Sequence, residues 1–363
     1  MRRSFTRRRA LGAAAAIAGS GVAVRLSQLS PQAAGATPPH QHHPLVPGSS
    51  HSGFAAGSTT VDPAVNGFDP SAIMRDFDWG KTRPLAGGRT LREWELVAYD
   101  KQIEIVPGVK FSAWTYNGRV PGPTLRAREG DLLRIHFANA GTHPHTIHFH
   151  GIHSAVMDGT PGIGEEIGGG LIDVGEKFTY EFDAQPFGLH LYHCHASPLA
   201  GHIAKGLYGT FIVDPPQGRP QADELVMVQN AFDPNFNDDN EVYAVNTVAF
   251  HFMYRPVRVK RGELVRIYLV NIVELDPINS FHIHGNFFHR FPTGTSLAPS
   301  EYTDNGHPGA GPTRRTGAPL SAHGEVHVPR PQERVRSARL DGPLRSRGVT
   351  DARTPATTDL VAR

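Results

Sequence analysis

The sequence predicts an all-β protein made of two tandem β-sandwich domains, the second incomplete, with disordered N- and C-terminal segments. Three observations predict this fold class. Apolar and polar residues alternate in short runs between turn residues, which is typical of half-buried strands. No stretch has a sustained helical period, and one strand-and-turn pattern occurs twice at a long spacing.

Composition limits the function classes that need to be considered. The chain has 363 residues, enough for two domains that each bury a core. A net charge of only +2 gives no indication of a nucleic-acid partner. The single cysteine excludes an intrachain disulfide, so its position needs another explanation.

The N-terminal 74 residues predict export followed by a linker. Residues 1–30 begin with a basic segment and continue into an Ala-rich run, which predicts a twin-arginine-like export signal. That run is too short to predict a membrane span. We therefore expect a periplasmic, cell-surface or secreted protein. Residues 31–74 are rich in Pro, Gly, Ser and His and predict a disordered linker.

The first predicted domain covers residues 75–216. Its alternating runs include "REWELVAYDKQIEI", "VKFSAWTYNG", "DLLRIHFANAG" and "KFTYEFDA". Turn signals such as Asn117-Gly118 separate these runs, as expected between neighbouring antiparallel strands.

An internal repeat predicts the second domain. "LRAREGDLLRIHFAN" at 125–139 is similar to "VRVKRGELVRIYLVN" at 257–271. Each copy is followed by a related motif, "HFHG" at 148–151 and "HIHG" at 282–285. We therefore expect two copies of one β-domain, the second over residues 220–304.

The segment "HLYHCHASPLAGH" contains the only cysteine and predicts a copper site. A thiolate and two imidazoles in a trigonal arrangement hold blue electron-transfer copper. Cys194 and His202 have a suitable spacing, and His145 is the candidate for the second imidazole. Leu207 stands where an axial methionine would be expected, so we predict a three-coordinate copper with a raised potential.

Three H-x-H pairs predict further metal ions. Residues i and i+2 of a strand point to the same face, so each pair presents two imidazoles side by side. Cys194 lies between two histidines and would point the opposite way, so one strand would join two sites. The pairs are His148 with His150, His193 with His195, and His282 with His284.

Taken together, "NGRVPGPTLRAREGD", "HTIHFHG", "MDG", "FGLHLYHCH" and "FHIHGNFFH" resemble the two-domain multicopper oxidases, laccase-like relatives of copper nitrite reductase. The resemblance covers residues 75–304 and implies two cupredoxin-like Greek-key sandwiches. It also implies a homotrimer with a copper cluster between chains. The implied ligands are His145, Cys194 and His202 for type 1 copper, His148 and His282 for type 2, and His150, His193, His195 and His284 for type 3.

The resemblance implies an oxidase activity. A reducing substrate would give single electrons to the type 1 copper, and the cluster would reduce dioxygen to water. Asp158 in "MDG" matches a residue that supplies protons near the cluster, although Asp-Gly is also a common turn. The donor stays open between phenols, aromatic amines, and cuprous or manganous ions.

Two alternatives remain at the level of the sequence. A copper nitrite reductase would need one type 2 copper beside an acidic residue, but His148 occupies the acidic position and His195 adds an imidazole. A non-catalytic blue-copper electron carrier would keep only the first site. The other histidines near these motifs we expect to pack or to support the ligands: His136, His143, His153, His190, His251 and His289.

The C-terminal segment, residues 305–363, does not fit the family pattern. It contains no Phe, Tyr, Trp, Ile or Met, and we expect no strand in it. If each codon is read from its second base, synonymous codon choices allow the codons of Glu325 to Val335 to encode "KFMFHAHKNEF". That reading contains the missing H-x-H. Our hypothesis is a one-base shift near codon 305. If the segment is genuine, two type 3 ligands are absent and the activity is impaired.

Overall fold

The structure is a computed structural model that describes residues 59–159, 170–260, 262–274, 279–306, 322–328 and 357–360, the last two ranges by backbone alone. The chain divides into two compact units, 1–46 and 47–363, and every described residue belongs to the second. The predicted export signal lies outside the described residues. The division into domains at 216–220 stays a prediction.

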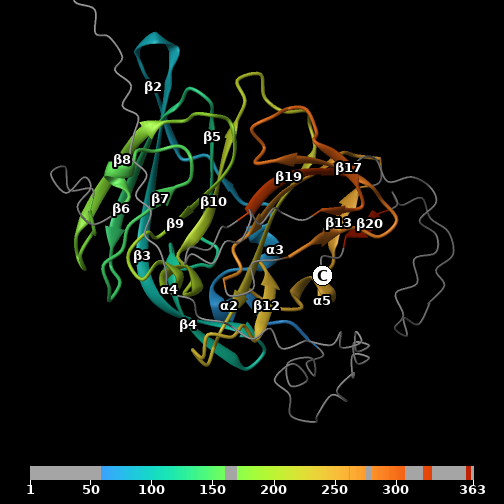
Figure 1. The fold of residues 1–363 in the computed structure, drawn as a ribbon, viewed down its shortest axis with the longest axis horizontal. Coiled ribbons are helices and arrows are strands. Elements are labelled where there is room, and N and C mark those ends of the chain that lie inside the picture. The colour runs from blue at the N-terminus through green and yellow to red at the C-terminus, as the bar shows by residue number, and fades with distance from the viewer. Residues whose placement is uncertain are drawn as a thin grey trace, which may run out of the picture. The chain divides into compact units, whose positions relative to one another are not determined.

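The first half of the described chain forms two five-stranded sheets (Figure 1). One has the order β2-β3-β6-β8 with β4 paired to β3, and the other has the order β1-β5-β10-β9-β7. Buried side chains of both sheets, such as Leu96, Ile135, Leu125 and Phe211, share one core. The strands are β1 Phe77–Asp78, β2 Lys81–Pro84, β3 Thr90–Val106, β4 Val109–Tyr116, β5 Thr124–Arg128, β6 Leu132–Asn139, β7 His148–Phe149, β8 Lys177–Asp183, β9 Gly188–His193 and β10 Tyr208–Asp214.

The second half is built around a six-stranded sheet of order β12-β11-β14-β19-β16-β17, with two short pairs, β13-β20 and β15-β18. These strands are β11 Asp223–Phe232, β12 Val242–Val245, β13 Val257–Lys260, β14 Val265–Asn271, β15 Phe281–His282, β16 Phe288–Pro292, β17 Glu301–Thr303, β18 Asn305–Gly306, β19 Ala322–Val328 and β20 Thr357–Leu360.

Helices are short throughout the described ranges, so the predicted all-β class is confirmed. The longest described α-helix has six residues. The helices are α2 Pro63–Asn66, α3 Pro70–Ile73, η2 Ala86–Gly88, η3 Ala155–Met157, α4 Leu199–Ala204 and α5 His251–Tyr254.

The internal repeat of the sequence folds into equivalent strands. β6 runs parallel to β3, and β14 runs parallel to β11. The turn before each strand contains a glycine with positive φ, +92° at Gly130 and +84° at Gly262. Because L-residues with a side chain rarely adopt such a φ, the matching glycines explain why both copies make the same turn.

The expectation of a disordered linker is wrong for residues 59–74. This stretch forms α2 and α3, and Ile73 and Met74 are buried in the core. Asp62 accepts a hydrogen bond from the Ala64 amide at 3.0 Å, and Asp69 accepts one from the Ser71 amide at 2.9 Å. Each aspartate precedes a proline at the first helical position, and this capping pattern is the signal that composition alone hid.

The expectation of no strand in residues 305–363 is also wrong for three short stretches. β18 pairs with β15, β19 lies between β14 and β16, and β20 pairs with β13. In "AHGEVHV" the small and apolar residues alternate with polar ones, which is a strand pattern. The missing aromatic residues concealed this local alternation. The rest of residues 305–363 lies outside the described residues.

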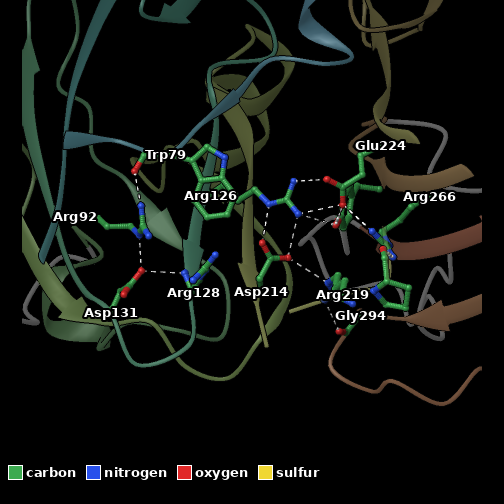
Figure 2. A network of polar contacts seen from close by, with 12 residues as sticks. Trp79, Arg92, Arg126, Arg128, Asp131, Asp214, Arg219, Glu224, Arg266 and Gly294 are labelled. Carbon is green, nitrogen blue, oxygen red and sulfur yellow. Dashed lines mark hydrogen bonds and ion pairs between the residues drawn. The ribbon is translucent and has the colours of Figure 1, made fainter. Parts of the chain in front are cut away.

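Arg126 joins the two halves of the described chain through a buried polar network (Figure 2). Its guanidinium donates to Asp214 of β10 at 2.8 Å and to Glu224 of β11 at 2.6 Å. Arg266 of β14 donates to the same Glu224 at 2.8 Å. Burial alone would raise the pKa of Glu224, but the hydrogen bonds and charges of Arg126 and Arg266 outweigh it and lower the pKa to about 2.

Candidate metal centre

The strand β9 positions the only cysteine. All six of its residues are buried, and it lies between β10 and β7 in the sheet. His193 is the Cα partner of Tyr208 on one side and of His148 on the other. Cys194 follows directly, and its amide donates to the carbonyl of Leu207 at 2.9 Å. The backbone around the thiol is therefore fixed on both sides.

Cys194, His145 and His202 converge as the sequence predicts. The Cys194 Sγ atom lies 3.2 Å from Nδ1 of His202 and 3.8 Å from Nδ1 of His145, and the two Nδ1 atoms are 3.3 Å apart. All three side chains are buried. The Thr146 amide donates to the sulfur at 3.4 Å, which favours a thiolate there.

The electrostatics of this group suit a copper ion. Burial lowers the pKa of His145 and of His202 to about 4, with a smaller effect from a neighbouring imidazole in each case. Both rings are therefore neutral, the form that binds metals. Burial raises the pKa of Cys194 to about 11, so metal binding would displace the thiol proton. Two imidazole nitrogens and one sulfur within 4.8 Å of one another match the donor set of blue copper.

A second group forms on the opposite side of β9. Ligand atoms of His148, His150 and His193 lie within 4.8 Å of one another, with the Nε2 atoms of His150 and His193 at 2.7 Å. Nδ1 of His193 lies 2.7 Å from the Cys194 carbonyl, so it donates there and leaves Nε2 facing His150. The His195 ring lies 5.0 Å from the His148 ring. The alternation of faces predicted for this strand therefore holds.

Asp158 lies beside this second group. Its carboxylate accepts from Nδ1 of His148 at 2.9 Å and from Nε2 of His153 at 2.6 Å. Burial would raise the pKa of Asp158, but these two hydrogen bonds outweigh it and hold the pKa well below its usual range. A carboxylate on one ring nitrogen orients a histidine so that its other nitrogen can bind a metal.

His153 was expected to pack or to support the ligands, and its contacts are closer than packing requires. Its side chain is fully buried, and it lies within 3.2 Å of His148 as well as against Asp158. The spacing of His148, His150 and His153 along the chain is the only signal for this role in the sequence.

His282 and His284 form a separate pair. Their rings are 4.8 Å apart, both residues are exposed, and Nδ1 of His282 donates to the Asp304 carbonyl at 2.6 Å. Among the described residues, no group of potential metal ligands includes either histidine. The structure of one chain thus brings together the ligands predicted in the first half and leaves this pair apart from them.

Trp114 lies beside the Cys194 group, a position that the sequence analysis did not predict. Its ring lies 5.2 Å from the His145 ring and 4.8 Å from the His202 ring, centroid to centroid. The exposed His143 ring lies 4.6 Å from it. A tryptophan in an alternating strand carries no signal of such a position. Of the other histidines near the motifs, His190 contacts backbone carbonyls and His251 contacts hydroxyl groups.

Comparisons with known proteins identify the family of the chain. Residues 98–218 match the multicopper oxidase family. A crystal structure of a multicopper oxidase is 61% identical, covers 75% of this chain and 91% of its own, and superposes with a TM-score of 0.69. The chain belongs to the multicopper oxidase family, which consists of copper oxidoreductases, and the predicted resemblance and cupredoxin-like fold are confirmed.

More distant relatives include both enzyme types considered above. The copper-containing nitrite reductase of Neisseria meningitidis is 30% identical over 63% of this chain and 58% of its own length. Laccase-2 of Botryotinia fuckeliana is 34% identical over 54% of this chain and 32% of its own length. The chain therefore spans less than two thirds of these curated relatives. In the described part of the chain, every helix is too short or too polar to cross a membrane.

Proposed function

We propose that the protein is a multicopper oxidase that couples one-electron oxidation of a reducing substrate to the four-electron reduction of dioxygen to water. One dioxygen, four electrons and four protons give two water molecules, so four donor oxidations balance each turnover. Bound copper would supply the one-electron redox chemistry. The residues of the chain would bind and orient the metals and donate hydrogen bonds around them.

The observation that carries this proposal is the end of β9. Cys194 faces His145 and His202 on one side, while His193 faces His148 and His150 on the other. Only one peptide unit separates the two groups. A one-electron site and a multi-metal site joined by so short a covalent path suit an oxidase that must collect four electrons.

For the ligands we propose the assignment that the resemblance implies. We assign His145, Cys194 and His202 to type 1 copper. We assign His148 to type 2 and His150, His193 and His195 to type 3. The exposed pair His282 and His284 would complete type 2 and type 3 sites of a neighbouring subunit, which is consistent with a homotrimer. Asp158 would orient His148 and accept or return protons beside the cluster.

Metal loading and spectroscopy test the proposal. The copper-loaded full chain should have an intense thiolate-to-copper absorption band, a near-ultraviolet shoulder, and oxygen consumption that yields water. Nitrite turnover without oxygen consumption would replace the oxidase with the nitrite reductase alternative, for which the Neisseria relative is the supporting observation. The blue band alone, with neither activity, would indicate an electron carrier.

Sequencing the gene across codons 295–350 tests the frame-shift hypothesis separately. If the new gene sequence lacks the extra base, the restored reading frame encodes the second H-x-H, and we expect a higher copper content per chain. If the new sequence confirms the base, the chain as written must load its cluster without those two histidines. We then expect low oxygen consumption and a retained blue band.

A further inference from the structure

A cavity of about 400 Å³ opens beside Trp114. It lies within the size range of small-molecule sites. We call it the Trp114 cavity. Its walls come from β3, β4, the loop before His145 and the residue after α4, and they include Asp100, Gln102, Ser112, Trp114, His143 and Lys205.

Trp114 separates this cavity from the Cys194 group. Neither His145 nor His202 lines the cavity, and both imidazoles are buried, with exposed fractions of 0% and 4%. The Trp114 ring contacts both of them and also lines the cavity wall. A molecule in the cavity would therefore reach the metal group through the Trp114 ring rather than by touching an imidazole.

The cavity does not offer the ligands that a metal ion needs as a substrate. Cuprous ions favour thioether or thiolate sulfur, and manganous ions favour several oxygen ligands. The residues that line the cavity include no Met or Cys, and their single carboxylate, Asp100, accepts hydrogen bonds from Thr142 at 2.6 and 3.3 Å. Two lysines, Lys101 and Lys205, also line the cavity. The Lys101 ammonium donates to the carbonyls of Asn66 at 2.6 Å and Gly118 at 2.7 Å. Two ammonium groups against one carboxylate give the lining a net positive charge, which does not favour a cation.

Lys205 and the rings around it instead suit an aromatic anion. The Lys205 Nζ atom lies 3.9 Å from the Phe236 ring and 5.5 Å from the Phe111 ring, and it donates to the Ser112 carbonyl at 3.1 Å. Burial lowers the pKa of this ammonium, and a nearby anion would oppose that effect. The half-buried Trp114 and the exposed His143 add two flat ring surfaces.

We propose that the Trp114 cavity binds the electron donor, and that the donor is an aromatic acid, a phenol or aromatic amine that carries a negatively charged group. Its ring would pack on Trp114 and His143, and its acidic group would pair with Lys205. This inference rests on the proposed oxidase function. Each donor would lose one electron, and a phenol would also release its hydroxyl proton to solvent.

Binding can be measured without turnover on the copper-loaded full chain. The probe is 3,4,5-trimethoxybenzoate, which has no oxidisable hydroxyl group, and 1,2,3-trimethoxybenzene is its neutral counterpart. Calorimetric titration should show that the wild-type protein binds the anion roughly tenfold more tightly, the usual size of one charge-assisted contact. Lys205→Met should abolish the preference for the anion and leave binding of the neutral probe nearly unchanged.

Three further variants make the test specific. Trp114→Leu should weaken binding of both probes, and His143→Ala should do so to a smaller extent. The control, Lys260→Gln, removes an exposed ammonium on β13 and should change neither. The blue absorption band checks that each variant keeps its copper site. If Trp114→Leu loses the band, Trp114→Phe replaces it. This variant keeps a smaller ring and should also weaken binding of both probes.

Equal binding of the two probes by the wild-type protein, or a preference that survives Lys205→Met, would overturn the proposal. Failure of the oxidase function looks different. In that case the loaded protein consumes no oxygen with any donor, yet the cavity variants still change probe binding. If manganous ions saturate oxygen consumption and Trp114→Leu does not change it, the electron donor is a metal ion that binds outside the Trp114 cavity.

Discussion

The two copies of the internal repeat end in nearly identical motifs but in different surroundings. After β6 the chain reaches His148 and His150, which lie against the buried strand β9 and within reach of His193. After β14 it reaches His282, the last residue of the two-residue strand β15, and His284 in the turn that follows, and both are exposed. The motif therefore sets only the spacing of two imidazoles. The neighbouring strand decides whether they form a metal group within one chain.

Two arginines at matching positions of the repeat also differ in their surroundings. Arg134 of β6 and Arg266 of β14 match in the repeat, yet their side chains are 27% and 2% exposed. Arg134 pairs with Glu93 and Glu181 near the surface. Arg266 pairs with Glu224 in the buried network of Figure 2. Equivalent residues should therefore differ greatly in what they contribute to stability.

The largest difference in absorption and activity is expected between substitutions of Cys194 and of His284. We expect Cys194→Ser to abolish the blue absorption band and donor-driven oxygen consumption, because the thiolate is the ligand that defines this type of copper site. His284→Ala should keep the band and lose oxygen consumption. Absorption spectra and copper content per chain measure both. A band that survives in Cys194→Ser would contradict the assignment of type 1 copper.

The next difference is in stability between the matched arginines. Arg266→Leu should lower the free energy of unfolding by about 3 kcal/mol, because it removes a buried positive charge from Glu224, whose side chain is only 20% exposed. Arg134→Leu should cost about 1 kcal/mol or less, since its partners are partly exposed to water. Chemical denaturation of the two variants under identical copper loading tests this. Equal losses would show that burial of the network contributes nothing.

A pH dependence should follow from Glu224. Its pKa is lowered in the folded chain to about 2 from an ordinary value of 4.5, so its contribution is fully present above pH 4.5. That contribution is lost as the pH falls toward 2, and by linkage it amounts to about 3 kcal/mol. Denaturation of the wild type and of Glu224→Gln across this range should show a smaller slope for the variant. If the free energy of unfolding falls with pH equally in both proteins, Glu224 does not cause this pH dependence.

The smallest expected effect concerns Leu207. This residue is fully buried, and its carbonyl accepts the Cys194 amide, while its side chain has no ligand atom. Leu207→Met would offer a weak axial ligand and should lower the reduction potential of the blue copper with little change in stability. Redox titration followed at the blue band measures the shift, with Leu207→Ile as the matched control. An unchanged potential would place Leu207 away from the axial position.

The sequence predicted the parts of the site that depend on periodicity. The alternation of faces around Cys194 follows from strand geometry, and Gly130 with Gly262 marked the repeated turn. It could not predict Trp114, because contact with His145 depends on how separate strands are placed in space. It also misjudged two segments where overall composition hid a local pattern. These are the capped turns at Asp62 and Asp69, and the alternating strand β19.

One peptide separates His193 from Cys194, and this has a consequence for how the protein can change over evolution. Because successive side chains of a strand alternate, inserting or deleting one residue between Gly188 and His193 would turn both residues to the wrong sides. Neither metal group could then be lost or moved without the other. Substitutions can tune each site separately, but a change in chain length within β9 would remove both together.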